Sequence, residues 1–335
     1  DHRLLWQAQR QLATYDGNEL GILQAVEKSC QRFPDDVSLQ LTELSLLAEL
    51  GKSQQRIDRL RDLVAKSMSH PLLKLQLAES LAEDGRYRDE AYDLLRKSIR
   101  QGNSYARTYL QLGDLLWHQH DRDSALQLYR YAACLEEKDE FLANRYFDAS
   151  VAMGRTSEAL DWLRARFDRF GGQSMQPAAT LHLALSRLRR HAESIDVLEK
   201  AMELRPDDTE LKLAAAHWLS TTSSEYWPRA QELLDAVRDS APERQWHEAA
   251  AEMAVMRGQW KQGLDHLTGL LPRSPLSMRL REKITELVAQ IDGEDAAIEH
   301  WRSAAKEFPH YQPLIERYAM SLRSRSLEQT RPVLE

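Results

Sequence analysis

Apolar residues recur along most of this chain at intervals of three and four positions, which predicts amphipathic helices. The pattern is clearest in the segments 124–132, 194–201 and 297–304, where small and apolar residues follow one helix face. Only 13 Gly and 11 Pro occur in 335 residues, fewer than a strand-rich protein with many turns needs. Hydrophobic residues make up 42% of the chain and charged residues 29%, which is typical of a folded domain. We therefore expect an all-α protein.

Residues that end or reverse helices are spaced regularly. Prolines follow predicted helices at intervals of 36, 33 and 34 residues, at Pro206, Pro242, Pro275 and Pro309. Glycines suited to the turn between two antiparallel helices recur every 34 residues, at Gly17, Gly51 and Gly85. After Pro206, the spacing of Asp207 and Glu210 predicts a capping box for the next helix. A period near 34 predicts an array of helix pairs.

Nine helix pairs account for the spacing. Their predicted ends lie near residues 34, 71, 104, 138, 173, 206, 242, 275 and 309. A closing helix over 312–324, with polar residues on its outer face, would cap the open end of the array. The prediction is one solenoid over residues 1–335, in which each pair buries its apolar face against its neighbours.

The clearest unit, over residues 106–139, carries a specific pattern. It reads Tyr109-x2-Leu112-Gly113-x2-Leu116, followed by Ala125, Tyr129 and Ala132. This resembles the tetratricopeptide repeat, with Tyr in the slot where the pattern has Trp. The resemblance extends over nearly the whole chain. It implies a right-handed superhelix whose first helices line a concave groove and whose second helices form the convex back. It also implies that proteins or peptides bind in that groove.

Composition excludes several classes of function. The net charge of −7 argues against nucleic acid as a partner, because nucleic-acid binders carry a strong positive field. No apolar run approaches the roughly 20 residues that span a bilayer, so we expect no direct membrane insertion. The two cysteines, Cys30 and Cys134, lie about three units apart, which predicts no disulfide between them. Motifs for phosphate binding, nucleophilic catalysis or zinc are absent from the sequence, which predicts no enzyme, no catalytic residues, no cofactor and no metal site.

The resemblance places Arg107, Asp114 and Trp117 at groove positions of the clearest unit. Trp117 is open to two interpretations, an aromatic anchor for a partner or a packing residue between repeats. Two groove chemistries of the family do not fit this chain. The groove positions of this unit lack the Lys and Asn of a carboxylate clamp, and three Asn in the whole chain cannot form an asparagine ladder.

Five glutamates form a periodic pattern in the last third of the chain. The first set has members 34 residues apart, and the second set, with the same spacing, follows it by four positions: Glu248, Glu282 and Glu316, then Glu252 and Glu286. Residues four apart share a helix face, and equal phase in successive repeats means stacked positions. The pattern predicts an acidic ridge on the groove side. The alternative is an ordinary solvated face.

The sequence favours a scaffold that binds a protein or peptide, with a basic partner at the C-terminal half. Two alternatives stay open at this point. The chain could be an assembly subunit of a bacterial envelope or secretion machine, such as one for polysaccharide export, or the regulatory region of a larger enzyme. Because the chain starts at Asp1 without Met, we expect a piece of a longer protein or a processed form. Cytoplasm and periplasm both fit the composition.

Overall fold

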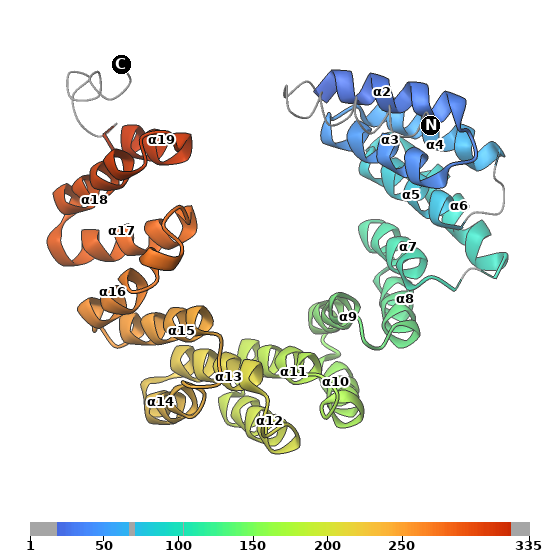
Figure 1. Cartoon of the computed structure of the whole chain (residues 1–335). Helices are drawn as coiled ribbons and strands as arrows, with labels where there is room; N and C mark the ends of the chain where they lie inside the picture. Colours follow the sequence, from blue (N-terminus) through green and yellow to red (C-terminus); the bar gives the residue numbers. More distant parts are fainter. Residues whose placement is uncertain (1–18, 67–70, 103, 323–335) are drawn as a thin grey trace. The chain divides into compact units, whose positions relative to one another are not determined.

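The computed structural model describes residues 19–66, 71–102 and 104–322, and within them the fold is entirely helical (Figure 1). These residues form eighteen α-helices and three short 3-10 helices, with no strand among them. The all-α prediction is thus confirmed. The chain divides into two compact units, Asp1–Arg166 and Phe167–Glu335, with the boundary inside one helix, α10.

The helices of the first unit follow one another with short connections. They are α2 (Glu19–Arg32), α3 (Val37–Glu49), α4 (Ser53–Lys66), α5 (Pro71–Glu83), η1 (Gly85–Tyr87), α6 (Arg88–Arg100), α7 (Ala106–His118), α8 (Arg122–Leu135), α9 (Glu140–Ala152) and α10 (Thr156–Phe170). Pro71 is the first residue of α5, a position that suits proline because a helix needs no N–H donor there. It therefore opens a helix, whereas the spacing of the prolines predicts it at the end of a helix pair.

The second unit continues the same alternation. Its helices are α11 (Gln176–Arg187), α12 (His191–Leu204), α13 (Thr209–Thr222), η2 (Ser224–Tyr226), α14 (Trp227–Ala236), α15 (Glu243–Met256), α16 (Trp260–Thr268), η3 (Leu271–Arg273), α17 (Met278–Asp292), α18 (Glu294–Glu307) and α19 (Gln312–Ser321). Of the predicted closing helix, α19 is the described part, and residues 323–324 lie outside the described residues. Gly17 also lies outside them.

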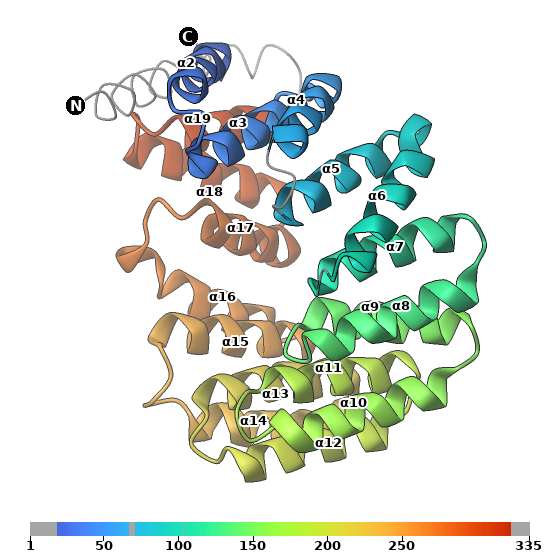
Figure 2. The same ribbon diagram turned by 90° about the vertical axis from the view of Figure 1, so that its right-hand side faces the viewer.

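Consecutive helices form hairpins such as α7–α8 and α11–α12, and the hairpins stack along each unit (Figure 1 and Figure 2). In unit 2 the first helices of the hairpins, α11, α13, α15 and α17, share one face, which we call the first-helix face. The second helices, such as α12 and α16, lie behind it.

The α7–α8 hairpin shows why small residues recur at fixed positions. Ala125 and Ala132 are fully buried between the helices, and Tyr129 is 1% exposed. A Cβ atom on Gly113 would lie 2.7 Å from Cε1 of Tyr129, closer than real Cβ contacts come. Only glycine therefore lets α7 approach the buried tyrosine ring of α8 this closely.

The turns inside the hairpins repeat one backbone conformation. Gly51 and Gly258 have φ values of 66° and 73°, in the left-handed region where glycine carries no steric penalty. His120 and Arg189 adopt the same conformation without glycine, with φ values of 66° and 58°. The turn geometry is thus set by the hairpin packing as well as by the residue type.

The start of α13 corrects one detail of the sequence analysis. The N-cap residue is Asp208, whose Oδ1 accepts a hydrogen bond of 2.9 Å from the Leu211 amide. Asp207, the predicted cap, lies one residue before it. Because α13 begins at Thr209, only Asp208 stands at the position from which a carboxylate reaches the first free amides.

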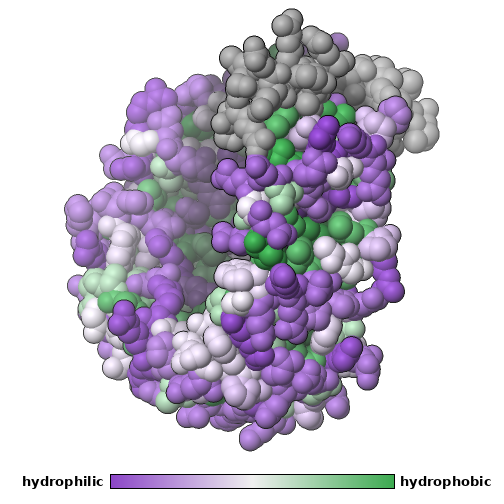
Figure 3. All heavy atoms as spheres, turned by 90° about the vertical axis from the view of Figure 1, so that its left-hand side faces the viewer, coloured by the Kyte–Doolittle hydropathy of each residue, from purple (hydrophilic) through white to green (hydrophobic). Residues whose placement is uncertain are grey.

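None of the described helices combines the length and the apolar character needed to cross a bilayer. On the face seen in Figure 3, hydrophilic side chains predominate and hydrophobic ones show in patches between them. This is expected where amphipathic helices turn their apolar stripes toward neighbouring helices.

Candidate functional site

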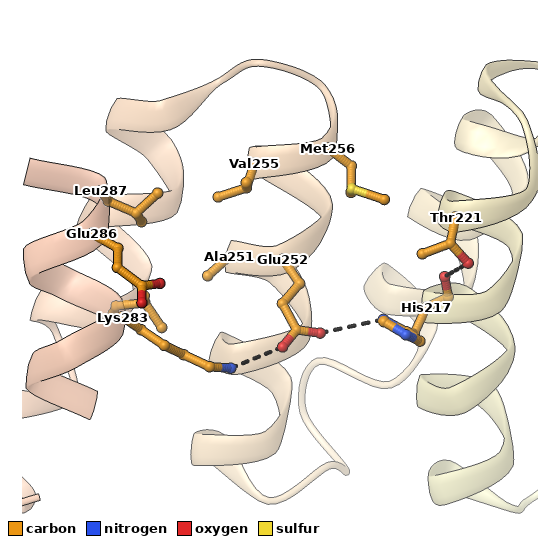
Figure 4. A pocket seen from close by; sticks show the side chains of 10 residues that line it. His217, Thr221, Ala251, Glu252, Val255, Met256, Lys283, Glu286 and Leu287 are labelled. Carbon is orange, nitrogen blue, oxygen red and sulfur yellow. Dashed lines mark hydrogen bonds and ion pairs between the residues drawn. The ribbon is translucent and has the colours of Figure 1, made fainter. Parts of the chain in front are cut away.

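A pocket of about 260 Å³ opens on the first-helix face of unit 2. Three successive first helices, α13, α15 and α17, contribute most of its walls (Figure 4), and Leu267 of α16 also lines it. We call this the α15 pocket. Its lining residues are His217, Thr221, Ala251, Glu252, Val255, Met256, Leu267, Lys283, Glu286 and Leu287.

The pocket exists because the helices around α15 are packed unevenly. α15 lies directly against α13, whereas α17 packs on α16, so a space remains between the first helices α15 and α17. Gly263 brings α16 close beneath this space. A Cβ at Gly263 would lie 3.0 Å from Cγ2 of Val255 and 3.2 Å from the Ala251 carbonyl oxygen.

The floor of the pocket is apolar. Ala251, Leu267 and Leu287 are buried, and Val255 is half-buried. Met256 stands at the edge with 47% of its surface exposed. An apolar group from a partner that covered Val255 and Met256 would remove their exposed surface from water, which favours binding.

A chain of charged groups borders the pocket. Glu252 of α15 contacts Nδ1 of His217 at 3.3 Å and Nζ of Lys283 at 2.9 Å, and the two partners take different oxygens of the carboxylate (Figure 4). The hydrogen bond from His217, followed by the charge of Lys283, holds the pKa of Glu252 at about 2, against the opposing effect of burial. The same contact raises the pKa of His217. The contacts from His217 through Glu252 to Lys283 link three consecutive helix pairs.

Glu286 is the exception among these groups. Its side chain lies on α17 beside Leu287, at the edge of the apolar floor (Figure 4). Within the described part of the chain it has no hydrogen-bond or ion-pair partner, and the residue is exposed. A free carboxylate therefore stands next to an apolar pocket.

The other members of the predicted acidic ridge have partners. Glu248 pairs with Arg244 of its own helix at 2.8 Å. Glu282 lies 3.2 Å from Arg317 of α19. The structure thus differs from the expected acidic ridge, because a cation of the same helix or of a following first helix pairs with each of these carboxylates.

Glu316, the last member of the ridge, accepts a hydrogen bond of 3.2 Å from Gln312 within α19. It does not line the α15 pocket. Of the five predicted glutamates, the pocket brings together Glu252 and Glu286.

Asp114, a predicted groove residue, belongs to unit 1 and holds helices together. Its carboxylate accepts a hydrogen bond of 2.7 Å from the Tyr129 hydroxyl and also contacts the Arg145 guanidinium of α9. Arg145 in turn lies over the Tyr129 ring, 4.9 Å from its centroid. The network joins α7, α8 and α9, so Asp114 stabilises the stacking of two hairpins.

Trp117 and Arg107 also lie in unit 1. The Trp117 ring is half-buried, 6.1 Å from the Tyr129 ring, and Arg122 stacks on it at 5.4 Å. These contacts show Trp117 packed on the second helix of its own pair. Arg107 is exposed, and its charge partly opposes the rise that burial causes in the pKa of Glu79.

Sequence reasoning missed His217, Lys283 and Met256. One signal could have found part of this set. His217 precedes Glu252 by 35 positions and Glu252 precedes Glu286 by 34, so the three occupy one repeat position on α13, α15 and α17. Lys283 has no such periodic relation to them. Among the residues that the structure describes, no group of three or more His, Cys, Asp or Glu side chains could hold a metal ion.

Comparison with known proteins gives matches only at the level of structure. No family model matches the chain, and no curated protein matches it. Among solved structures, a MamA fragment from Desulfovibrio magneticus RS-1 is 14% identical, with a TM-score of 0.41, over 52% of this chain and 98% of that one. The structure of Naa15/Naa10 bound to HypK-THB is 13% identical, with a TM-score of 0.43, over 98% of this chain and 57% of that one. YrrB, a TPR protein with an unusual peptide-binding site, is 17% identical, with a TM-score of 0.36, over 57% of this chain and 98% of that one.

The internal geometry of the hairpins decides the repeat type. Repeats of about 34 residues form helix pairs, and Gly113 and Ala125 lie at the helix crossing that the repeat pattern assigns to small residues. This chain is a TPR-like repeat protein. Gly263 lies on α16 where Ala125 lies on α8, so in a TPR-like array the α15 pocket is built over a standard helix crossing.

Proposed function

We propose that this TPR-like chain is a protein-binding scaffold and that the first-helix face of unit 2 binds a segment of a partner protein. The observation that carries the proposal is the α15 pocket, an apolar hollow on three consecutive first helices. An apolar side chain of the partner inserts between Val255 and Leu287, and the rest of the segment runs across the neighbouring first helices.

The size of the pocket supports a side chain as its occupant. Sites for drug-sized ligands and cofactors usually enclose about 300–1,000 Å³ and are deep. The α15 pocket has about 260 Å³ and is open to solvent. Its charged border is largely neutralised within the protein by the contacts of Glu252, so covering it leaves few charges without partners.

A matched pair of variants tests the proposal. Met256 at the pocket edge and Leu204 at the end of α12 are both 47% exposed, and Leu204 does not line the pocket. Peptides are first selected from a random displayed library on the wild-type protein. Their affinities for Met256→Glu and Leu204→Glu are then measured by fluorescence anisotropy.

The proposal predicts that Met256→Glu weakens the selected peptides about tenfold or more, because burial of an apolar side chain contributes roughly 1.5–3 kcal/mol. Leu204→Glu should bind them as the wild type does. Circular dichroism checks that both variants are folded. Equal binding to all three proteins would show that the pocket is not the binding site.

A further inference from the structure

We infer that the segment bound in the α15 pocket carries a Lys or Arg close to its apolar anchor, and that this cation pairs with Glu286. The inference rests on the proposed function and names the chemistry of the partner. Its basis is the difference between Glu286 and the other charged groups around the pocket.

Glu252 and Lys283 already have charged or hydrogen-bonding partners within the protein. Both oxygens of Glu252 are in contact with cationic or hydrogen-bonding groups, and Lys283 is one of these. An incoming charge would have to compete with contacts that are already formed. Glu286 has no such contact among the described residues and is exposed.

Glu286 lacks the contact to the next first helix that comparable carboxylates make. Asp114 pairs with Arg145, and Glu252 with Lys283, each 31 positions later on the next first helix. The residue 31 positions after Glu286 is Arg317, but Arg317 pairs with Glu282.

Arg317 is thus in contact with Glu282, which lies four positions, about one helical turn, before Glu286 on α17. A cation from a partner would give Glu286 the contact that it lacks among the described residues.

Charge also selects against other partners. An acidic residue at this edge of the pocket would be repelled by Glu286, since Lys283 is already neutralised by Glu252. An apolar segment that covered Glu286 would remove the carboxylate from water without a partner, which is unfavourable. A neutral hydrogen-bond donor could contact the carboxylate, but only a basic residue also neutralises its charge, so the site favours basic segments and disfavours acidic or apolar ones.

Geometry places the cation near the anchor. Glu286 and Leu287 are adjacent in the chain, and Leu287 is part of the apolar floor. An extended segment advances about 3.3 Å per residue, so a residue one or two positions from the anchor reaches the Glu286 carboxylate. The expected motif is therefore an apolar residue with Lys or Arg within two positions of it.

The test uses the peptides selected on the wild-type protein. They should be enriched in Lys or Arg within two positions of an apolar residue. Glu286→Gln should weaken them about two- to fivefold, since an exposed ion pair contributes about 0–1 kcal/mol. Glu286→Lys should weaken the binding of these peptides more than Glu286→Gln does. Glu203→Gln, which removes an exposed glutamate on α12 away from the pocket, controls for net charge and should have no effect.

A peptide with its basic residue changed to Gln completes a double-mutant cycle with Glu286→Gln. Once Glu286→Gln has been made, the change in the peptide should weaken binding little further. Added salt should narrow the difference between wild type and Glu286→Gln, as the Debye length falls from about 30 Å at 0.01 M to about 8 Å at 0.15 M.

Two results would overturn the inference and leave the proposed function standing. The binding of the selected peptides could be weakened by Met256→Glu while the peptides show no enrichment in Lys or Arg, or the peptides could bind Glu286→Gln as tightly as the wild type. Enrichment of acidic peptides would also overturn it. Peptides that do not depend on Met256 would contradict the proposed function itself.

Discussion

Replacing Gly113 by Ala should destabilise unit 1, although alanine is the better helix former. The added Cβ would lie 2.7 Å from Cε1 and 3.0 Å from Cδ1 of Tyr129. The tyrosine ring is 1% exposed, and its hydroxyl donates a 2.7 Å hydrogen bond to Asp114. Arg145 lies on the ring at 4.9 Å. The ring can therefore yield only by moving against these contacts.

Three effects set the magnitude. Overpacking in a well-packed core costs about 1–3 kcal/mol. Loss of a hydrogen bond to a charged group costs about 1.5–3 kcal/mol where the ring shifts far enough to break it. Replacing Gly by Ala inside a helix contributes up to about 1 kcal/mol in the opposite direction. The net expectation is destabilisation by about 1–3 kcal/mol, measured by urea denaturation followed by circular dichroism.

The same change in a Tyr129→Leu background separates the clash from helix propensity. With the ring gone, Gly113→Ala should be neutral or stabilise by up to about 1 kcal/mol. The sign of the effect thus depends on the ring. If Gly113→Ala stabilised the wild-type protein, or destabilised both backgrounds equally, the close approach of α7 to Tyr129 would not be the reason for the glycine.

Three further predictions concern single contacts. Asp208→Ala should destabilise by about 1–2 kcal/mol through loss of the N-cap, and Asp207→Ala by less than about 0.5 kcal/mol, compared by urea denaturation. Burial lowers the pKa of His182, so below pH about 6.5 the unfolded chain binds a proton at this histidine more readily than the folded chain does. The free energy of unfolding should therefore fall as the pH falls below about 6.5, by up to about 1.4 kcal/mol per pH unit. His182→Gln should reduce this pH dependence. Arg166→Met should cost roughly 1–3 kcal/mol in thermal or urea unfolding, because the charge-assisted hydrogen bonds of the buried guanidinium to Glu140 and to the Glu137 carbonyl would be lost. An unchanged midpoint would contradict that role.

Much of the fold could be predicted because its main determinants are local and periodic. Spacing alone gave the helix pairs, and the Gly113 and Ala125 pattern gave the crossing that the structure shows. Helix ends were less predictable. Asp207 and Asp208 are chemically alike, and only the backbone register decides which of them caps α13.

The candidate site could be predicted only in part. Repeat phase correctly placed Glu252 and Glu286 on neighbouring first helices, because stacked positions follow from a constant period. The phase could not reveal that Lys283 reaches Glu252, since that contact depends on how far α17 lies from α15. Nor could it reveal the pocket, which arises because α17 packs on α16.

The charged positions of the first helices have two competing uses. A carboxylate that pairs with the next first helix, as Asp114 and Glu252 do, stabilises the stacking of repeats and is neutralised in doing so. The same position without a partner is available for binding. Charge at a groove position therefore does not by itself predict a binding residue in a repeat array. The informative observation is which charges already have partners on neighbouring first helices. On α17, Glu286 has no partner among the described residues, and it lies beside the apolar floor of the α15 pocket.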